Sequence, residues 1–137
     1  MTADANKALL EAFVDAVFDQ DRDRMGRLLT DDVVCHVVLN IRDSVPLPTN
    51  REAVLEFMCG QSALFYEKGK TTFDAIQSFG DDDGAALIGT MRATTPEGKP
   101  YMNEYAFFVK TRDGMIAEVR ELCDTKFWYQ QMAPHQA

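Results

Sequence analysis

The sequence predicts an α+β fold in which helices come first and an antiparallel sheet follows. In the first third of the chain, apolar residues recur at the three-to-four-residue spacing of a helix. From Lys70 onward, strand-like segments are separated by short links that contain Gly with Asp, Pro or Glu, as in hairpin turns. Helices followed by a meander of strands are typical of a domain whose helices cover one face of a curved sheet.

About three helices are expected before the sheet. The first spans about Ala3 to Gln20, and Asp21 is expected to cap a short second helix that carries Met25. A loop at 42–50 follows, and the capping-box spacing of Thr49 and Glu52 predicts a third helix that ends near residue 60. Residues 61–68 either extend that helix or cover the core as a loop.

Five strands are predicted, and the residues between them supply the turns. They are Val33 to Leu39, Thr71 to Phe79, Ala85 to Thr95, Tyr101 to Thr111 and Met115 to Thr125. With 137 residues and no break in composition, the chain is expected to form a single domain over residues 1–137. Residues 130–137 are predicted to be a frayed tail.

Charge and cysteine content exclude several classes of protein. The net charge is −8, and no cluster of Lys and Arg suggests a nucleic-acid or anionic membrane partner. The 3 cysteines have neither disulfide nor zinc-site spacing, so no metal is expected. The N-terminus has no signal-peptide pattern, and no apolar run is long enough to span a membrane. A cytoplasmic location is therefore expected.

The order of the predicted elements resembles the nuclear transport factor two-like superfamily. The segment RDGMIAEVRELCDT, residues 112–125, is similar to the last hairpin of SnoaL-like polyketide cyclases and limonene epoxide hydrolases. The resemblance spans roughly Ala8 to Trp128. It implies a cone-shaped sheet with helices packed over its concave face, an apolar pocket inside the cone, and chemistry without a cofactor.

One carboxylate is predicted to lie in that pocket. Alternation along the last strand places Glu121 on the more apolar face, together with Ala117, Val119 and Cys123. Apolar surroundings disfavour the charged form and raise the pKa of a carboxyl group, which suits general acid/base catalysis. The resemblance adds that the cyclases and epoxide hydrolases carry their acid/base Asp at this position. The alternative is that Glu121 pairs with an Arg and only stabilises the fold.

Further site residues are predicted on the neighbouring strand. Tyr101, Asn103, Tyr105 and Phe107 share a face, on which Asn103 and Tyr105 can donate hydrogen bonds to a ligand oxygen. The resemblance places the catalytic His of the cyclases at Phe107, so that His is absent here. Trp128 is expected to close the cone and contact the ligand.

Two other strands depart from the epoxide hydrolases of this fold. Those enzymes have an Arg and an Asp at the positions of Thr90 and Arg92, and water-holding residues at the positions of Cys35 and Val37. The missing residues argue against epoxide hydrolysis. Arg92 is a candidate catalytic partner of Glu121 if it faces the pocket, and an outer-face residue otherwise. Thr90, Cys35 and Phe107 are candidate ligand contacts.

These residues leave two hypotheses about function. The first is a cofactor-independent isomerase, cyclase or dehydratase that acts on a small apolar oxygenated compound. The second is a ligand-binding or dimerisation module without catalysis. A homodimer through the outer face of the sheet is expected in either case, with Ala106, Phe108 and Leu122 as contacts.

Overall fold

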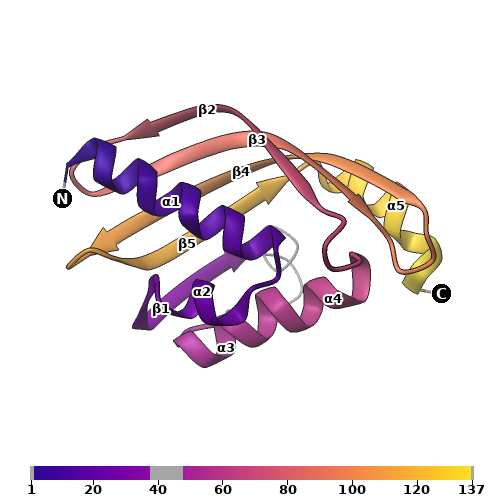
Figure 1. The fold of residues 1–137 in the computed structure, drawn as a ribbon, viewed down its shortest axis with the longest axis horizontal. Helices are drawn as coiled ribbons and strands as arrows, with labels where there is room; N and C mark the ends of the chain where they lie inside the picture. The colour runs from indigo at the N-terminus through magenta and orange to yellow at the C-terminus, as the bar shows by residue number, and fades with distance from the viewer. Residues whose placement is uncertain (1, 38–47, 137) are drawn as a thin grey trace.

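The computed structural model of the chain describes residues 2–37 and 48–136, arranged as one curved sheet with helices around it (Figure 1). The predicted loop at 42–50 therefore lies mostly outside the described residues. The helices are α1 (Ala3–Phe18), α2 (Arg22–Gly26), α3 (Arg51–Leu55), α4 (Ser62–Phe65) and α5 (Thr125–Gln136), with a π-helical segment over Glu56–Gln61 between α3 and α4. The strands are β1 (Leu29–Val37), β2 (Thr72–Gly80), β3 (Gly84–Thr94), β4 (Pro100–Arg112) and β5 (Met115–Cys123).

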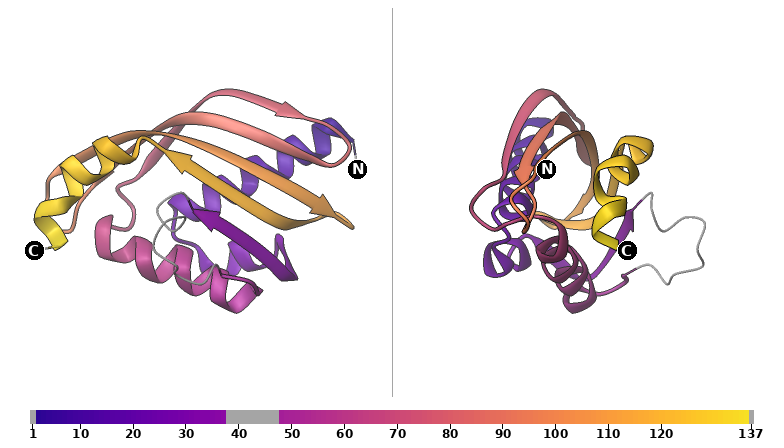
Figure 2. Two further views of the ribbon diagram at one scale, coloured as in Figure 1. Left: turned by 180° about the vertical axis from the view of Figure 1, so that it is seen from behind. Right: turned by 90° about the vertical axis from the view of Figure 1, so that its right-hand side faces the viewer.

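The sheet has five strands in the order β1-β5-β4-β3-β2. Strands β2 to β5 form the predicted antiparallel meander, and β1 pairs in parallel with β5. Helix α1 crosses one face of the curved sheet, and the run from α3 to α4 lies beside β1 (Figures 1 and 2). The α+β class with helices on a curved, unclosed sheet is thus confirmed, although the described residues contain more helices than the three expected.

The helix caps explain where two of the helices begin. Asp21 caps α2 as predicted, because its side chain accepts a hydrogen bond from the Arg24 backbone N–H. The predicted Thr49 cap of α3 is wrong. Asn50 caps that helix by accepting from the Ala53 N–H over 2.9 Å, since the helix begins one residue later than expected.

The C-terminal segment is a helix where a frayed tail was predicted. The Asp124 carboxylate accepts a hydrogen bond from the Phe127 N–H over 3.0 Å and so caps the first turn of α5. Trp128 and Met132, one helical turn apart, are both buried. The cap and these two anchors hold α5 at one end of the sheet (Figure 2).

An irregularity at the start of β5 changes which residues face the core. Strict alternation predicts Ile116 on the outer face, but it is fully buried. The register between β4 and β5 shifts between Lys110 and Thr111, so Ile116 turns inward while Val119 and Glu121 keep the predicted inward orientation.

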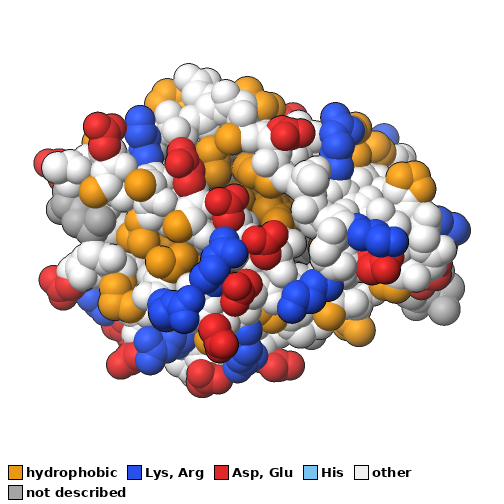
Figure 3. Space-filling view, viewed as in Figure 1, with side chains coloured by type: hydrophobic (Ala, Val, Ile, Leu, Met, Phe, Trp, Pro, Cys, Tyr) orange, Lys and Arg blue, Asp and Glu red, His pale blue; other side chains and the backbone are white. Residues whose placement is uncertain are grey.

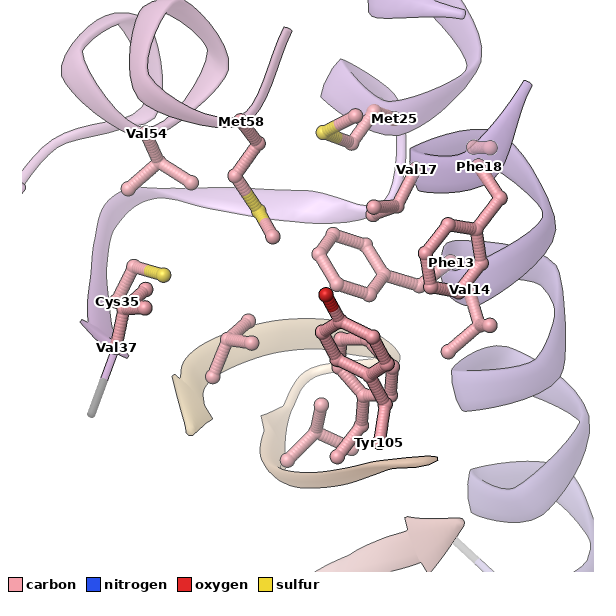
Figure 4. Packing of buried hydrophobic residues seen from close by; sticks show 14 of the residues in the cluster. Phe13, Val14, Val17, Phe18, Met25, Cys35, Val37, Val54, Met58 and Tyr105 are labelled. Atoms are coloured by element: carbon pink, nitrogen blue, oxygen red, sulfur yellow. The ribbon is translucent and has the colours of Figure 1, made fainter. Parts of the chain in front are cut away.

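The core lies between α1 and the concave face of the sheet (Figure 4). The aromatic rings of Phe18 on α1, Phe73 on β2, and Phe107 and Tyr105 on β4 contact one another, with centroids 5.1 to 6.1 Å apart. This aromatic cluster forms a wall beside the cavity described next. No helix among the described residues is long and apolar enough to cross a membrane.

Candidate active site

A partly open cavity of about 110 Å³ lies between the end of α1, the α3–α4 run, α5 and the sheet. In the space-filling view, apolar side chains line a recess near the middle of one face, with acidic and basic side chains gathered below it (Figure 3). The cavity is lined mainly by apolar and aromatic side chains. Its lining residues are Val17, Phe18, Gln20, Val37, Phe57, Met58, Ser62, Phe65, Tyr66, Thr71, Met91, Tyr105, Glu121, Cys123 and Trp128.

The π-helical segment supplies one side of this cavity. Its residues Phe57 and Met58 both line the cavity, and Met58 points inward opposite α1 (Figure 4). A π-helical insertion shifts the phase of the following turn and is frequent at functional sites. Here α4 follows directly, so that Tyr66, at its end, also reaches the cavity.

Glu121 is the only carboxylate among the described residues that line the cavity. It lies opposite Phe107 on β4 and beside Val37 on β1, so both strand neighbours are apolar. Within residues 2–37 and 48–136, its carboxylate has no hydrogen bond and no ion pair. Burial raises the pKa of Glu121 from 4.5 to about 7. The side chain remains partly exposed because it borders the open space of the cavity.

Two thiols near Glu121 are held in the protonated form. Burial, followed by the charge of Glu121, raises the pKa of Cys35 and that of Cys123 to about 12. Neither is a thiolate nucleophile at neutral pH. Cys35 is fully buried and does not reach the cavity wall, contrary to prediction, whereas Cys123 lines the cavity.

A hydrogen-bonded network of three tyrosines lies in the same part of the molecule. The Tyr105 hydroxyl is 2.8 Å from that of Tyr101 and 3.2 Å from that of Tyr66. Asn103 donates to the Tyr101 oxygen over 3.0 Å, and Trp128 Nε1 donates to the Tyr66 oxygen over 3.2 Å. Tyr105, Tyr66 and Trp128 line the cavity, so the network borders its interior.

Several predicted site residues lie elsewhere. Arg92 is exposed on the outer face of β3, where its guanidinium contacts the Met102 sulfur, and Thr90 is on the same face. The predictions that these two residues reach the pocket are wrong, because the inward face of β3 is the one that carries Leu87 and Met91. Arg92 is therefore no partner for Glu121.

Two predicted residues of β4 lie inside the core but not at the cavity wall. Phe107 is fully buried within the aromatic cluster and, contrary to prediction, does not line the cavity. Asn103 is 2% exposed and acts on the network through Tyr101. Tyr105 and Trp128 do line the cavity.

Sequence reasoning missed Tyr66 and Tyr101 as site residues. Tyr101 was placed on the inward face of its strand, and its spacing of four residues from Tyr105 was a usable signal. Tyr66 lies within residues 61–68, which the sequence assigns to either a helix or a loop, so the direction of its side chain could not be predicted.

His36 lies on the outer surface, where its Nε2 is 3.4 Å from the Glu118 carboxylate. The part of the chain that the structure describes has no group of three or more potential metal ligands.

A curved sheet with helices over an apolar cavity defines the nuclear transport factor two-like class of fold. The family model of the SnoaL-like domain matches residues 10–119, and the chain belongs to this family. A comparison with curated proteins gives no match.

Solved structures with low sequence identity share the fold. The structure of TerC co-crystallised with polyporic acid has a TM-score of 0.77 at 14% identity, over 94% of this chain and 98% of that chain. A candidate SnoaL-like polyketide cyclase from Jannaschia Sp. CCS1 has a TM-score of 0.76 at 13% identity, over 96% and 92% of the two chains. An LEH-like epoxide hydrolase from M. tuberculosis has a TM-score of 0.72 at 15% identity, over 98% and 93%.

Proposed function

We propose that this SnoaL-like protein is a cofactor-independent acid/base enzyme that acts on a small apolar oxygenated compound, by isomerisation, cyclisation or dehydration. The observation that carries the proposal is Glu121, an unpaired carboxylate in an apolar cavity with its pKa raised to about 7. A carboxyl group with a pKa near neutrality can both accept and return a proton at physiological pH.

The surroundings of Glu121 support a role in chemistry over a role in stability. A carboxylate kept for stability is normally paired with a cation or several donors. Arg92 is on the outer face, and no other cation lines the cavity among the described residues. The protein therefore retains a carboxylate whose ionised form is destabilised by burial, at a position that borders the open cavity. A small ligand is also a reasonable occupant of this cavity, since the structural neighbour TerC was co-crystallised with a small molecule, polyporic acid.

The second candidate is a binding module of the same fold without catalysis. It is favoured by Phe107, which stands opposite Glu121 and cannot exchange a proton. In such a module Glu121 would hold a ligand hydroxyl and transfer nothing. The two candidates differ in whether a proton leaves the bound ligand.

We expect the protein to catalyse hydrogen–deuterium exchange at the carbon next to the carbonyl of small cyclic ketones in D₂O. The exchange is followed by proton NMR with cyclohexanone. Glu121→Gln should lower the protein-catalysed rate about a hundredfold, because an amide cannot accept the proton. Since the base must be ionised, the wild-type rate should rise with pH through about 7 and then level off. Tyr66, Tyr105, Cys35 and Cys123 face Glu121, but all four are expected to stay protonated in this range.

Glu104→Gln is the matched control, because Glu104 is exposed on the outer face of β4. It should exchange at the wild-type rate. Equal exchange rates for wild type and Glu121→Gln would contradict the proposal of an enzyme and leave the binding module as the proposed function.

We also propose that a second copy of the chain covers the outer face of the sheet. Phe108 and Leu122 are 44% and 37% exposed there. Lys110, Glu118 and Arg120 flank them with both signs of charge, so two copies of this face can pair with opposite charges together. Light scattering at high concentration should give the mass of a dimer, and Phe108→Glu should shift it toward the monomer. A wild-type monomer at high concentration would exclude this interface.

A further inference from the structure

The protein supplies no positive partner for the Glu121 carboxylate. Over residues 2–37 and 48–136, no Lys, Arg or His lines the cavity, and the carboxylate makes neither an ion pair nor a hydrogen bond. A carboxylate taken out of water is normally stabilised by a cation or by several hydrogen-bond donors. The ionised form of Glu121 therefore lacks a stabilising partner that a ligand can provide.

Basic side chains on the helical side of the molecule are engaged by surface carboxylates. The Arg22 guanidinium on α2 is 2.7 Å from the Glu52 carboxylate and 3.6 Å from that of Glu56. The Arg24 guanidinium is 3.1 Å from the Asp19 carboxylate. The whole chain has 22 acidic and 14 basic residues, so the electrostatic field around the protein attracts cations rather than anions.

Aromatic rings form much of the remaining cavity wall. They come from α1, the π-helical segment, the end of α4, β4 and α5, and they are Phe18, Phe57, Phe65, Tyr66, Tyr105 and Trp128. The face of an aromatic ring carries partial negative charge, so it attracts a cation and repels an anion. Burial raises the pKa of Tyr66 and that of Tyr105, so neither tyrosine adds a full negative charge at neutral pH. Such a wall accommodates both a hydrocarbon group and a positive charge.

We propose that the cavity binds a small apolar amine in its ammonium form, with the nitrogen at Glu121 and the hydrocarbon group among the aromatic rings. This inference goes beyond the proposed acid/base function, because binding requires no proton transfer from carbon. In the proposed reaction the amine is an inhibitor, since it occupies the base. The cavity of about 110 Å³ is somewhat smaller than the ~150 Å³ that accepts benzene, so its closed part takes no more than one ring.

The position of Glu121 lowers the cost of bringing a charged group into the cavity. An ammonium group loses favourable hydration when it enters a closed apolar space. The Glu121 side chain is partly exposed and borders the open part of the cavity, so the ammonium group keeps some of its water while it contacts the carboxylate. The contact is a charge-assisted hydrogen bond, which is stronger than one between neutral groups.

The affinity for the amine should follow the ionisation of Glu121. Its pKa in the empty cavity is about 7, whereas an alkylamine, like Lys, stays protonated to about pH 10. The affinity should therefore rise with pH through about 7 and then level off. Cys35 on β1, Cys123 on β5, Tyr66 and Tyr105 face Glu121, and all four stay protonated in this range. Among the described residues, α1, α5 and the π-helical segment present only uncharged side chains to the cavity.

Cyclohexylamine is the probe, and cyclohexanol, which has the same ring and no charge, is the matched ligand. NMR titration at pH 8 measures both dissociation constants. We expect wild type to bind the amine about tenfold to a hundredfold more tightly than the alcohol. The indole N–H signal of Trp128, the single tryptophan of the chain, should shift during the titration because Trp128 lines the cavity.

The preference for the amine should disappear in two ways. In Glu121→Gln the two ligands should bind about equally, because the amide has nearly the same shape and no charge. In wild type at pH 5 the protonated carboxyl should give the same result. Glu104→Gln, which removes an exposed carboxylate from β4, should keep the wild-type preference. Equal affinities of wild type for the two ligands at pH 8, a preference that survives in Glu121→Gln or at pH 5, or no binding of the amine would each overturn the proposal.

The binding measurement and the exchange reaction fail independently. A preference for the amine without exchange of cyclohexanone in wild type would remove the enzyme and keep the ammonium site. Exchange without this preference would keep the enzyme and remove the ammonium site. Where both hold, cyclohexylamine should inhibit exchange competitively, with an inhibition constant equal to its dissociation constant.

Discussion

Glu121→Gln is expected to stabilise the protein at pH 8 by up to about 3 kcal/mol while it removes proton transfer. The pKa of Glu121 is raised from 4.5 to about 7 by burial. At 1.36 kcal/mol for each pKa unit, that rise is the cost, about 3 kcal/mol, of keeping the ionised carboxylate in the folded cavity. The neutral amide of Gln has nearly the same shape and avoids the cost. Because the side chain is partly exposed, the figure is an upper value.

The sign of the pH dependence follows from the same pKa. Between pH 4.5 and about 7, the folded protein holds a proton on Glu121 that the unfolded chain has released. The stability contributed by the neutral carboxyl is fully present below pH 4.5 and is lost as the pH rises through about 7. Urea unfolding of wild type should therefore give a falling free energy over this window, relative to Glu121→Gln.

The control for this measurement is again Glu104→Gln, which removes an exposed carboxylate from the neighbouring strand. Its free energy of unfolding should follow that of wild type across the same pH range, including pH 8. If Glu121→Gln unfolds with the wild-type pH dependence, the carboxylate is not destabilised in the fold and its pKa is ordinary. A gain in stability with a loss of activity is the combination expected of a residue kept for function.

The strands and Glu121 could be predicted from sequence because a strand has a period of two. On β4, alternation correctly grouped Tyr101, Asn103 and Tyr105 on the inward face. On β3 the same rule grouped Thr90 with Arg92 but could not say which group faces inward. Both faces of AALIGTMRAT carry small and apolar residues, so the pattern has no clear apolar side.

The rest of the site depended on irregular structure. Ile116 turned inward because the register shifts at the start of β5, and a single extra residue in a strand leaves no reliable trace in the sequence. Tyr66 reached the cavity because a π-helical segment precedes α4, which alters the helical phase. The network itself joins residues from three separate segments, namely β4, the end of α4, and α5. Its hydrogen bonds arise only when the helices and the sheet are packed together.

Phe107→Ala is expected to lower the free energy of unfolding by about 3–5 kcal/mol. Phe107 has no exposed surface and contacts the rings of Phe18, Phe73 and Tyr105 at centroid distances of 5.9 to 6.1 Å. These rings come from α1, β2 and β4, so a cavity at Phe107 separates three elements at once. Urea unfolding at pH 6 measures the loss.

Phe79→Ala provides the comparison for Phe107, since it removes the same ring from a strand position that is 60% exposed. It should cost less than about 1 kcal/mol. The difference matters for the site because Phe107 lies directly opposite Glu121. An apolar ring at that position helps to keep the carboxyl neutral. Phe107→Ala should therefore lower the pKa of Glu121, measured by carboxyl NMR, as the surroundings become wetter. A loss below about 1 kcal/mol would mean that Phe107 is not a packing residue and that the position is free for another role.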